Sequence, residues 1–225
     1  QTCALPIYRA MSAASNVPAT SIRTFRLNRD EMGRVGNAIN AIAARKTWLM
    51  ERNPSPYVDD IIAAVRREAA SNGTRLAVVD YIQLLRGPRS RRYRASDREQ
   101  ELSDIGTAFM LAARDDGIAY VVGAQLNRDC ERRDNKRPAV SDLRGSGTLE
   151  ERAKTVVMVY RGCEYGPAVE GIDEQTTDDR GEPCAPYLLD GEEWGALIEL
   201  LVEKNSNGEK GRVRATWHGP TMRVS

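Results

Sequence analysis

Apolar residues recur along this chain at two different periods, which predict alternating helices and strands. Three stretches carry apolar residues at helical spacing: 28–45, 56–72 and 97–116. Three short runs, 76–79, 118–124 and 155–160, are almost continuously apolar and rich in β-branched residues, as is typical of buried strands. A strand, a helix and a second strand joined by short connections form a βαβ unit, whose crossover we expect to be right-handed.

Local signals give the ends of these helices. Asn28 with Glu31, and Ser96 with Glu99, have the spacing of helix-initiating capping boxes. Pro56 suits the first position of the second helix, which Gly73 ends, and Gly117 ends the third. The inward faces are predicted to carry Val58, Ile61, Ile62 and Val65 in the second helix and Leu102, Ile105, Phe109 and Ala112 in the third.

The carboxy-terminal third has a different composition. Residues 162–193 are rich in Gly, Pro, Asp and Glu with few apolar anchors, which predicts a long, mobile surface excursion. Residues 194–202 and 212–217 then alternate apolar and polar side chains on either side of the turn signal 205–208. This pattern predicts an antiparallel hairpin.

Polar side chains end two of the predicted strands. Asp80 follows the run 76–79 and Gln125 follows 118–124, so the two should lie side by side at the carboxyl edge of a parallel sheet. At that edge Asp80 could hold an Mg²⁺-bound water, as in half of an ATP site. Two structural alternatives stay open: Asp80 as the cap of the next turn, and Gln125 as a buried amide with its hydrogen bonds satisfied.

Composition narrows the class of protein. With 225 residues, 41% of them hydrophobic and 29% charged, the chain suits one soluble globular domain. A net charge of +1 excludes a globally basic nucleic-acid binder, so any DNA-binding surface must come from local clustering. Four scattered cysteines and one histidine suggest neither a zinc site nor a disulfide framework, which favours a reducing cytosol. No apolar run approaches the roughly 20 residues that cross a bilayer, so no membrane partner is expected.

The usual phosphate cradle of an ATP site is missing. It requires Gly-x-x-x-x-Gly-Lys-Ser/Thr, and the chain contains no Gly-Lys dipeptide. The segment Gln1–Ile7 resembles the translation of a sequencing-library adapter, although a short genuine leader is the alternative. We therefore set residues 1–8 aside as an artefact and treat 9–225 as a partial domain whose cradle lies upstream.

Several short motifs, taken together, carry a resemblance to a known family. In order they are 78–84 (VVDYIQL), 98–101 (REQE), 125–128 (QLNR), 136–138 (KRP), 141–144 (SDLR) with 146–147 (SG), and 159–161 (VYR). From about Ala13 to nearly the end, the chain resembles the carboxy-terminal motor domain of bacterial and phage replicative DNA helicases, the DnaB family. The resemblance implies an α/β fold: a RecA-like P-loop NTPase core with a mostly parallel sheet, flanking helices and a C-terminal antiparallel hairpin, here without its first strand and P-loop.

The resemblance also implies roles for the two strand-end residues. Asp80 would be the Walker B carboxylate that binds waters of Mg²⁺, and Gln125 the sensor of the ATP γ-phosphate. The reaction would be phosphoryl transfer to water, with ATP and Mg²⁺ as cofactors.

Two segments are expected to bind DNA. The densest positive cluster surrounds Tyr93 and would line a channel for single-stranded DNA without sequence preference; its arginines are Arg86, Arg89, Arg91, Arg92 and Arg94. By resemblance, Arg144, Gly145 and Gly147 belong to a loop that holds consecutive phosphates. A solvated charged loop and a flexible turn are the respective alternatives.

The hairpin departs from the family pattern. The family usually has Lys-Gln-Arg-Asn-Gly, whose arginine reaches a neighbouring subunit's nucleotide, and here Ser206 stands at that position. Lys204 can still supply one positive charge to a neighbour's γ-phosphate, although lysine cannot reproduce a bidentate guanidinium. Gly145 replaces a usual glutamate, and 151–154 lack the family's acidic pattern, which suggests a divergent helicase. We read His218 and the cysteines Cys130, Cys163 and Cys184 as structural.

The expected function is therefore that of an ATP-dependent replicative helicase motor, cytoplasmic and working as a homo-hexameric ring on single-stranded DNA, with primase and helicase loader as further partners. We expect this chain alone to be inactive, because it lacks the P-loop and the family's catalytic glutamate. Two alternatives remain: a non-catalytic DNA-binding or ring-forming remnant, and a recombinase or clock-type ATPase of the same fold.

Overall fold

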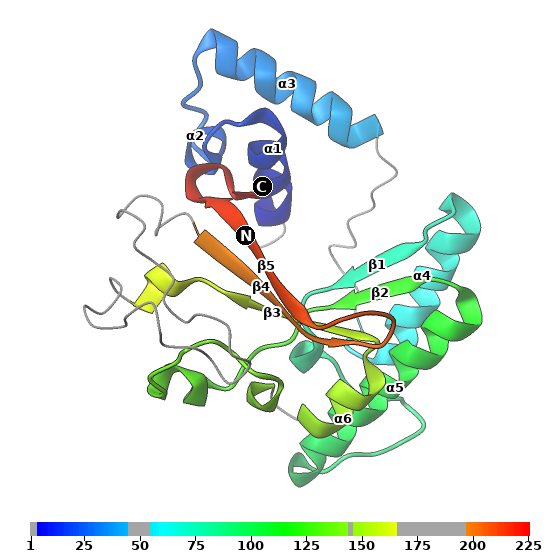
Figure 1. The fold of residues 1–225 in the computed structure, drawn as a ribbon. Helices are drawn as coiled ribbons and strands as arrows, with labels where there is room; N and C mark the ends of the chain where they lie inside the picture. The colour runs from blue at the N-terminus through cyan, green and yellow to red at the C-terminus, as the bar shows by residue number, and fades with distance from the viewer. Residues whose placement is uncertain (1–3, 45–54, 144–145, 166–196) are drawn as a thin grey trace. The chain divides into compact units, whose positions relative to one another are not determined.

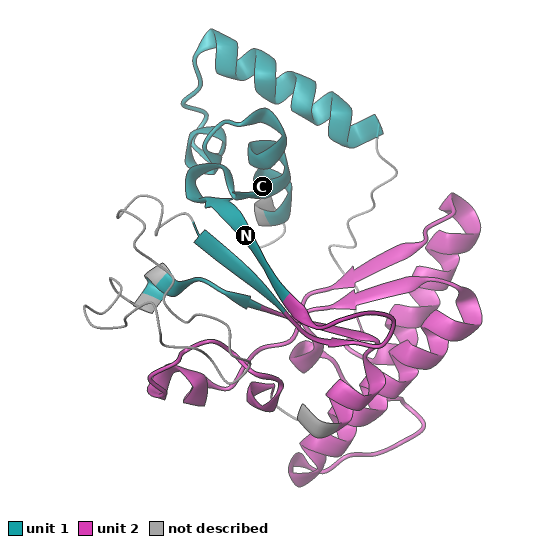
Figure 2. Ribbon diagram, viewed as in Figure 1, with its two compact units in different colours: residues 1–47, 159–201, 212–225 teal, residues 48–158, 202–211 magenta. Residues whose placement is uncertain are grey.

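The computed structural model describes residues 4–44, 55–143, 146–165 and 197–225 (Figure 1). The chain divides into two compact units, where composition predicted one domain. Unit 1 comprises 1–47, 159–201 and 212–225, and unit 2 comprises 48–158 and 202–211 (Figure 2). Two separate clusters of buried side chains accompany the division, one in each unit.

Unit 1 contains three amino-terminal helices, α1 (Ala4–Ser15), α2 (Ala19–Arg23) and α3 (Arg29–Ala44). The predicted capping box at the start of α3 is confirmed: the Glu31 N–H donates to Asn28 Oδ1, and the Asn28 N–H donates to Glu31 Oε2, both at 2.8 Å. Helix α1 includes residues 4–8 of the segment predicted to be an artefact, and Tyr8 packs against the buried cluster of this unit, which consists of Val17, Ile22 and Val35.

Unit 2 is built around the predicted βαβ unit. Helix α4 (Val58–Asn72) leads into β1 (Leu76–Val79), and α5 (Arg98–Asp116) leads into β2 (Ala119–Val122). Strands β1 and β2 pair in parallel, as predicted. Gly73 and Gly117 end the two helices in the left-handed conformation, with φ of 70° and 66°, which a glycine adopts without steric cost.

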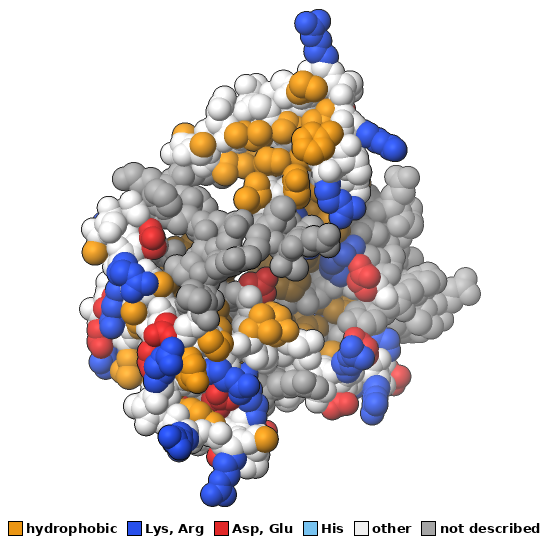
Figure 3. All heavy atoms as spheres, turned by 180° about the vertical axis from the view of Figure 1, so that it is seen from behind, with side chains coloured by type: hydrophobic (Ala, Val, Ile, Leu, Met, Phe, Trp, Pro, Cys, Tyr) orange, Lys and Arg blue, Asp and Glu red, His pale blue; other side chains and the backbone are white. Residues whose placement is uncertain are grey.

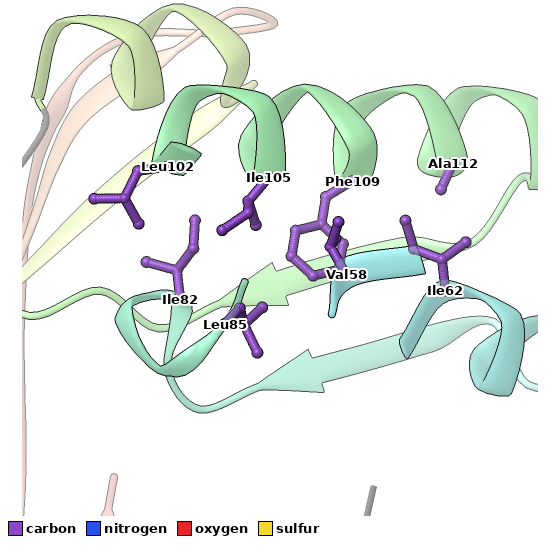
Figure 4. Packing of buried hydrophobic residues seen from close by; sticks show 8 residues of the cluster. All are labelled: Val58, Ile62, Ile82, Leu85, Leu102, Ile105, Phe109 and Ala112. Atoms are coloured by element: carbon purple, nitrogen blue, oxygen red, sulfur yellow. The ribbon is translucent and has the colours of Figure 1, made fainter. Parts of the chain in front are cut away.

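The core of unit 2 lies between the helices and one face of this sheet (Figure 4). All predicted inward residues of α5 are buried, and Ile105 is fully enclosed. The inner face of the sheet packs against the same cluster through Val79, Tyr120 and Val122, while Ile82 and Leu85 enter it from the segment after β1.

The prediction that residues 76–79 form a fully buried strand is wrong, and β2 is likewise exposed on one face. Val78 is 70% exposed and Val121 is 55% exposed, because only the opposite face of the pair packs against the helical cluster. Continuous apolar composition therefore did not distinguish a strand covered on one face from one covered on both.

Helix starts were predicted less well than helix ends. Helix α4 begins at Val58, two residues after Pro56. Ahead of α5, a 3₁₀ turn, η2 (Ala95–Asp97), takes the place of the predicted box of Ser96 and Glu99. The Asp97 carboxylate accepts the Arg94 N–H at 2.9 Å, so the acidic partner lies two residues earlier than predicted.

A second, four-stranded sheet has the order β3-β4-β5-β6. Its strands are β3 (Thr155–Tyr160), β4 (Leu197–Asn205), β5 (Gly211–His218) and β6 (Arg223–Val224), and β5 pairs antiparallel to β6. The predicted hairpin is thus present as β4 and β5. Strand β3 belongs to this sheet and is not paired with β2. In β3, Val156 and Met158 are buried while Val157 and Val159 are exposed.

Short helices complete the described chain: η1 (Ile82–Leu84), η3 (Arg128–Arg132), η4 (Val140–Asp142), α6 (Ser146–Arg152), η5 (Gly162–Tyr165) and η6 (Gly219–Thr221). Most of the predicted excursion 162–193, including Cys184, lies outside the described residues. None of the helices described is long and apolar enough to span a membrane.

The surface of each unit has its own character in the view of Figure 3. Hydrophobic side chains gather over unit 1 in this view. Exposed hydrophobic residues of this unit include Met32 and Ile39 on α3, at 62% and 46%, and Phe25 in the turn after α2, at 84%. Over unit 2, acidic and basic side chains are interspersed. The near-zero net charge therefore reflects mixed charges, and a cationic site has to be found among individual side chains.

Candidate functional site

The carboxyl ends of β1 and β2 meet as predicted. The Gly123 N–H donates to the Val79 carbonyl at 2.8 Å, and the Ile82 N–H donates to the Gly123 carbonyl at 2.9 Å. A Cβ on Gly123 would lie 3.5 Å from Asp80 Oδ1, so the Asp80 carboxylate stands directly beside the end of β2. We call Asp80, Gly123 and Gln125 the strand edge.

Asp80 is exposed at this edge. Among the residues that the structure describes, none donates a hydrogen bond to its carboxylate, so Asp80 does not cap the following turn. The peptide bond between Asp80 and Tyr81 is cis. An exposed carboxylate at the end of a parallel strand is free to accept hydrogen bonds from metal-bound water.

Gln125 is held through its backbone. The Gln83 side chain pairs with it twice: Gln83 Nε2 donates to the Gln125 carbonyl, and the Gln125 N–H donates to Gln83 Oε1, each at 3.1 Å. The Gln125 side chain itself is exposed, which is incompatible with a buried, satisfied amide. Sequence reasoning missed Gln83, although it lies in the motif 78–84 that carried the resemblance.

A buried carboxylate ties the beginning of the arginine-rich segment to α5. Glu101 is 4% exposed, accepts the Gly87 N–H at 3.0 Å and pairs with Arg98. Arg98 also donates to the carbonyls of Gln83 at 2.8 Å and Leu85 at 3.1 Å. These residues of the motif 98–101 had no predicted role, because nothing in their spacing indicates which backbone groups they meet.

A cavity of about 1280 Å³ opens beside this network in unit 2. We call it the basic cavity, because two predicted DNA-binding arginines line it. It brings together the arginine-rich segment, the start of α5 and the segment that leads into 144–147. Three arginines and two acidic residues line it together with polar and apolar side chains: Gln83, Arg91, Arg92, Tyr93, Ser96, Asp97, Arg98, Glu99, Gln100, Leu102, Asn127, Ser141, Leu143 and Thr148.

The predicted arginines separate into two groups. Arg91 lines the cavity and pairs with Asp104 at 2.8 Å, while Arg92 lines it and makes no ion pair with any described residue. Arg89 is elsewhere: it pairs with Asp60 at 2.7 Å, and its guanidinium lies 4.1 Å from the ring centre of Tyr57. Arg94 is exposed and does not line the cavity.

Tyr93 holds the arginine-rich segment in place. Its hydroxyl donates to Asp104 at 2.6 Å, and its ring lies so close to Gly87 that a Cβ there would be 2.5 Å away. Burial raises the pKa of the Tyr93 phenol, and the hydrogen bond to Asp104 raises it further. Burial also acts to raise the pKa of Asp104, but the hydrogen bonds from Tyr93 and Gln100 together with the charge and hydrogen bond of Arg91 outweigh it, so the carboxyl has a lowered pKa.

Lys204, on β4, contacts the end of α6. Its Nζ donates to the carbonyls of Glu150 at 2.6 Å and Glu151 at 3.3 Å, which are acceptors left unpaired at a helix carboxyl terminus. The Ser206 N–H donates to the Lys154 carbonyl at 2.9 Å, and the Ser206 side chain is exposed. Helix α6 begins at Ser146, so Gly147 lies in its first turn; Arg144 and Gly145 lie outside the described residues.

The cofactor expectation fits part of this site. Asp80 is a single exposed carboxylate, and the described residues contain no group of three or more His, Cys, Asp or Glu side chains that could form a metal site by themselves. Such an edge suits a metal held through water and by the phosphates of a nucleotide. Of the residues predicted to be structural, Cys130 is buried and free, and the exposed His218 has its Nε2 3.0 Å from Ser225 Oγ.

Comparisons with known proteins cover almost the whole chain. Residues 4–225 match the family described as the DnaB-like helicase C terminal domain. Over 209 residues the chain is 29% identical to the replicative DNA helicase DnaB of Geobacillus stearothermophilus, and over 208 residues it is 28% identical to the replicative DNA helicase DnaC of Bacillus subtilis. Each alignment covers 92% of this chain and 40% of the relative, so the chain spans about two fifths of the curated relatives it matches.

Solved structures show the same fold. One of them, described as an ATPase domain, superposes with a TM-score of 0.77 at 24% identity, covering 96% of this chain and 68% of that domain. A DnaB-like replicative helicase, described with its interactions with primase, gives a TM-score of 0.76 at 23% identity, covering 97% of this chain and 46% of that one.

Proposed function

Because the chain belongs to the family of the DnaB-like helicase C-terminal domain, we propose that its parent protein couples ATP hydrolysis to movement along single-stranded DNA and so unwinds duplex during replication. One observation carries the proposal: the strand edge and the basic cavity lie in the same compact unit, and Gln83 lines the cavity while its side chain pairs with the Gln125 backbone at the strand edge. A DNA-translocating motor needs such a connection between its nucleotide site and its DNA-binding site.

At the strand edge, Asp80 would accept hydrogen bonds from waters of Mg²⁺, and the exposed Gln125 side chain would meet the γ-phosphate. Bound Mg²⁺ neutralises charge that develops on the β- and γ-phosphates. The exposure of both side chains supports these roles, since each must reach a ligand outside the core.

In the basic cavity, Arg91 and Arg92 would neutralise consecutive phosphates of single-stranded DNA. Ser141 and Leu143 line the same cavity and lead directly to Arg144, Gly145 and Gly147, which supports a shared DNA path for the two predicted segments. Arg89 and Arg94 fall outside that path, and we assign them no phosphate contact.

The assembly belongs to the proposal as well. We propose a homo-hexameric ring in the cytosol, with primase and helicase loader as partners, in which Lys204 and the exposed Ser206 approach a neighbour's nucleotide. An arginine finger typically contributes about 10³–10⁵ in rate. Replacing Ser206 by arginine in the intact protein should therefore accelerate hydrolysis, unless another residue already supplies that charge.

The test is ATP-driven unwinding of a forked duplex by the intact protein. Asp80→Asn should abolish ATP hydrolysis and unwinding while leaving single-stranded DNA binding in place. Asp134→Asn, at an exposed aspartate, is the matched control and should behave as wild type. Equal unwinding by the Asp80 variant would refute the role of Asp80, and DNA binding without any ATP turnover in wild type would favour the non-catalytic remnant.

A further inference from the structure

Gln83 contacts both halves of the candidate site. Its side-chain amide pairs with the Gln125 backbone through two hydrogen bonds of 3.1 Å, while its own carbonyl accepts the Arg98 guanidinium at 2.8 Å. Gln83 also lines the basic cavity. One residue thus stands between the sensor position and the space in which DNA is proposed to bind.

The pairing with Gln83 matters because the β-ladder has already ended. The paired register of β1 and β2 stops at Val79 and Val122, and Gln125 lies three residues beyond. A primary amide has donors and an acceptor, so the Gln83 side chain reproduces the two bonds that a neighbouring strand would supply. Among the residues described, Gln83 is the hydrogen-bonding partner of the Gln125 backbone.

Arg98 fixes the other end of this link. Its guanidinium donates to two carbonyls, those of Gln83 and Leu85, and to the buried Glu101 carboxylate. Glu101 in turn accepts the Gly87 N–H, at the start of the arginine-rich segment. The rigid planar fork of arginine makes these contacts together, which the single charge of a lysine cannot do.

We propose that Gln83 and Arg98 are positioning residues that couple occupancy of the basic cavity by single-stranded DNA to the placement of the Gln125 backbone. The inference rests on the proposed function and adds residues through which its two sites communicate. A strand in the cavity meets Gln83 and Arg98 on their exposed sides and restrains them, which lowers the frequency with which the Gln83–Gln125 pairing opens. By linkage, a ligand that fixes Gln125 strengthens DNA binding by the same factor.

Amide hydrogen exchange in the 225-residue chain tests this directly, with and without saturating oligothymidylate. In wild type, exchange at the Gln125 N–H should slow when the oligonucleotide binds. Gln83→Met keeps the length of the side chain and removes both hydrogen bonds, so basal exchange at Gln125 should rise by about threefold to tenfold and no longer respond to DNA.

Two further variants separate coupling from general disturbance. Asn72→Leu removes a side-chain amide that lies outside the cavity and donates to Glu68, and it should retain the wild-type response. Arg98→Lys keeps the charge beside Glu101 but cannot bridge two carbonyls. It should leave DNA-free exchange at Gln125 close to wild type and abolish the response to DNA.

The failures are distinguishable. If wild-type chain binds oligothymidylate and Gln125 exchange does not change, the coupling is refuted while DNA binding stands. A response that survives in both Gln83→Met and Arg98→Lys refutes the assignment of these residues. If oligothymidylate does not bind the wild-type chain at all, the proposed DNA site and the coupling both fall.

Discussion

Replacing Arg92 by alanine should weaken single-stranded DNA binding more than replacing Arg89. Both arginines belong to the same short cluster, and sequence alone gives them equal weight. Arg92 lines the basic cavity and makes no ion pair among the described residues, whereas Arg89 is already neutralised by Asp60 and lies over the Tyr57 ring. A strand entering the cavity therefore meets the charge of Arg92 and not that of Arg89.

The magnitude follows from counterion release. Each phosphate neutralised on a single strand contributes about 0.7 to the slope of log affinity against log salt. Losing one contact should lower affinity about eightfold at roughly 50 mM salt, about fivefold at roughly 100 mM and about threefold at roughly 200 mM. The loss should thus shrink as salt rises, which a general folding defect would not produce.

The assay is fluorescence anisotropy of labelled oligothymidylate titrated with the 225-residue chain at several salt concentrations. Arg89→Ala is the matched control, since it removes the same side chain from the same cluster. We expect its salt slope to equal that of wild type, with any loss appearing as lower thermal stability. Two results would refute the conclusion that ion-pair partners decide which arginine binds DNA. One is an unchanged salt slope in Arg92→Ala; the other is a salt slope lowered by the same amount in Arg92→Ala and Arg89→Ala.

Three further predictions concern the framework. Ile105→Ala, at a fully buried position, should lower the free energy of unfolding by about 2–5 kcal/mol. Leu111→Ala, on the exposed side of the same helix, should lower it by only about 1 kcal/mol. Urea denaturation of both variants measures the difference. Lys204→Met should lower the free energy of unfolding by about 1 kcal/mol, because the contacts with α6 are lost. Lys210→Met in the same hairpin should leave it unchanged. Equal stability of the two variants would show that Lys204 has no structural role. Because its pKa is lowered on folding, Asp104 should stabilise the fold at pH values above its unfolded pKa of about 3.9. This contribution should be lost as the pH falls through the folded pKa. In Asp104→Asn, the free energy of unfolding should therefore depend less on pH in this acidic range.

Local signals accounted for much of the fold. The helical period placed the buried face of α5 correctly, and Gly73 and Gly117 end their helices where a left-handed residue was expected. The meeting of the two strand ends followed from the βαβ pattern alone, since parallel strands share a carboxyl edge. Strand burial did not follow, because composition cannot tell whether one face or two are covered.

Residue partners in the site could not be predicted, because they depend on contacts between distant segments. Asp60 lies on α4, far in sequence from Arg89, and nothing in the arginine cluster shows that this carboxylate reaches one member and not another. Gln83 looks like an ordinary polar residue after a strand until the fold brings the Gln125 backbone alongside it. A positive cluster therefore predicts that cations are available, while the ion pairs made on folding decide which of them a phosphate can use. Among the described residues that line the basic cavity, that distinction points to Arg92 as a cation without an ion-pair partner, while Arg91 is shared between Asp104 and any ligand of the cavity.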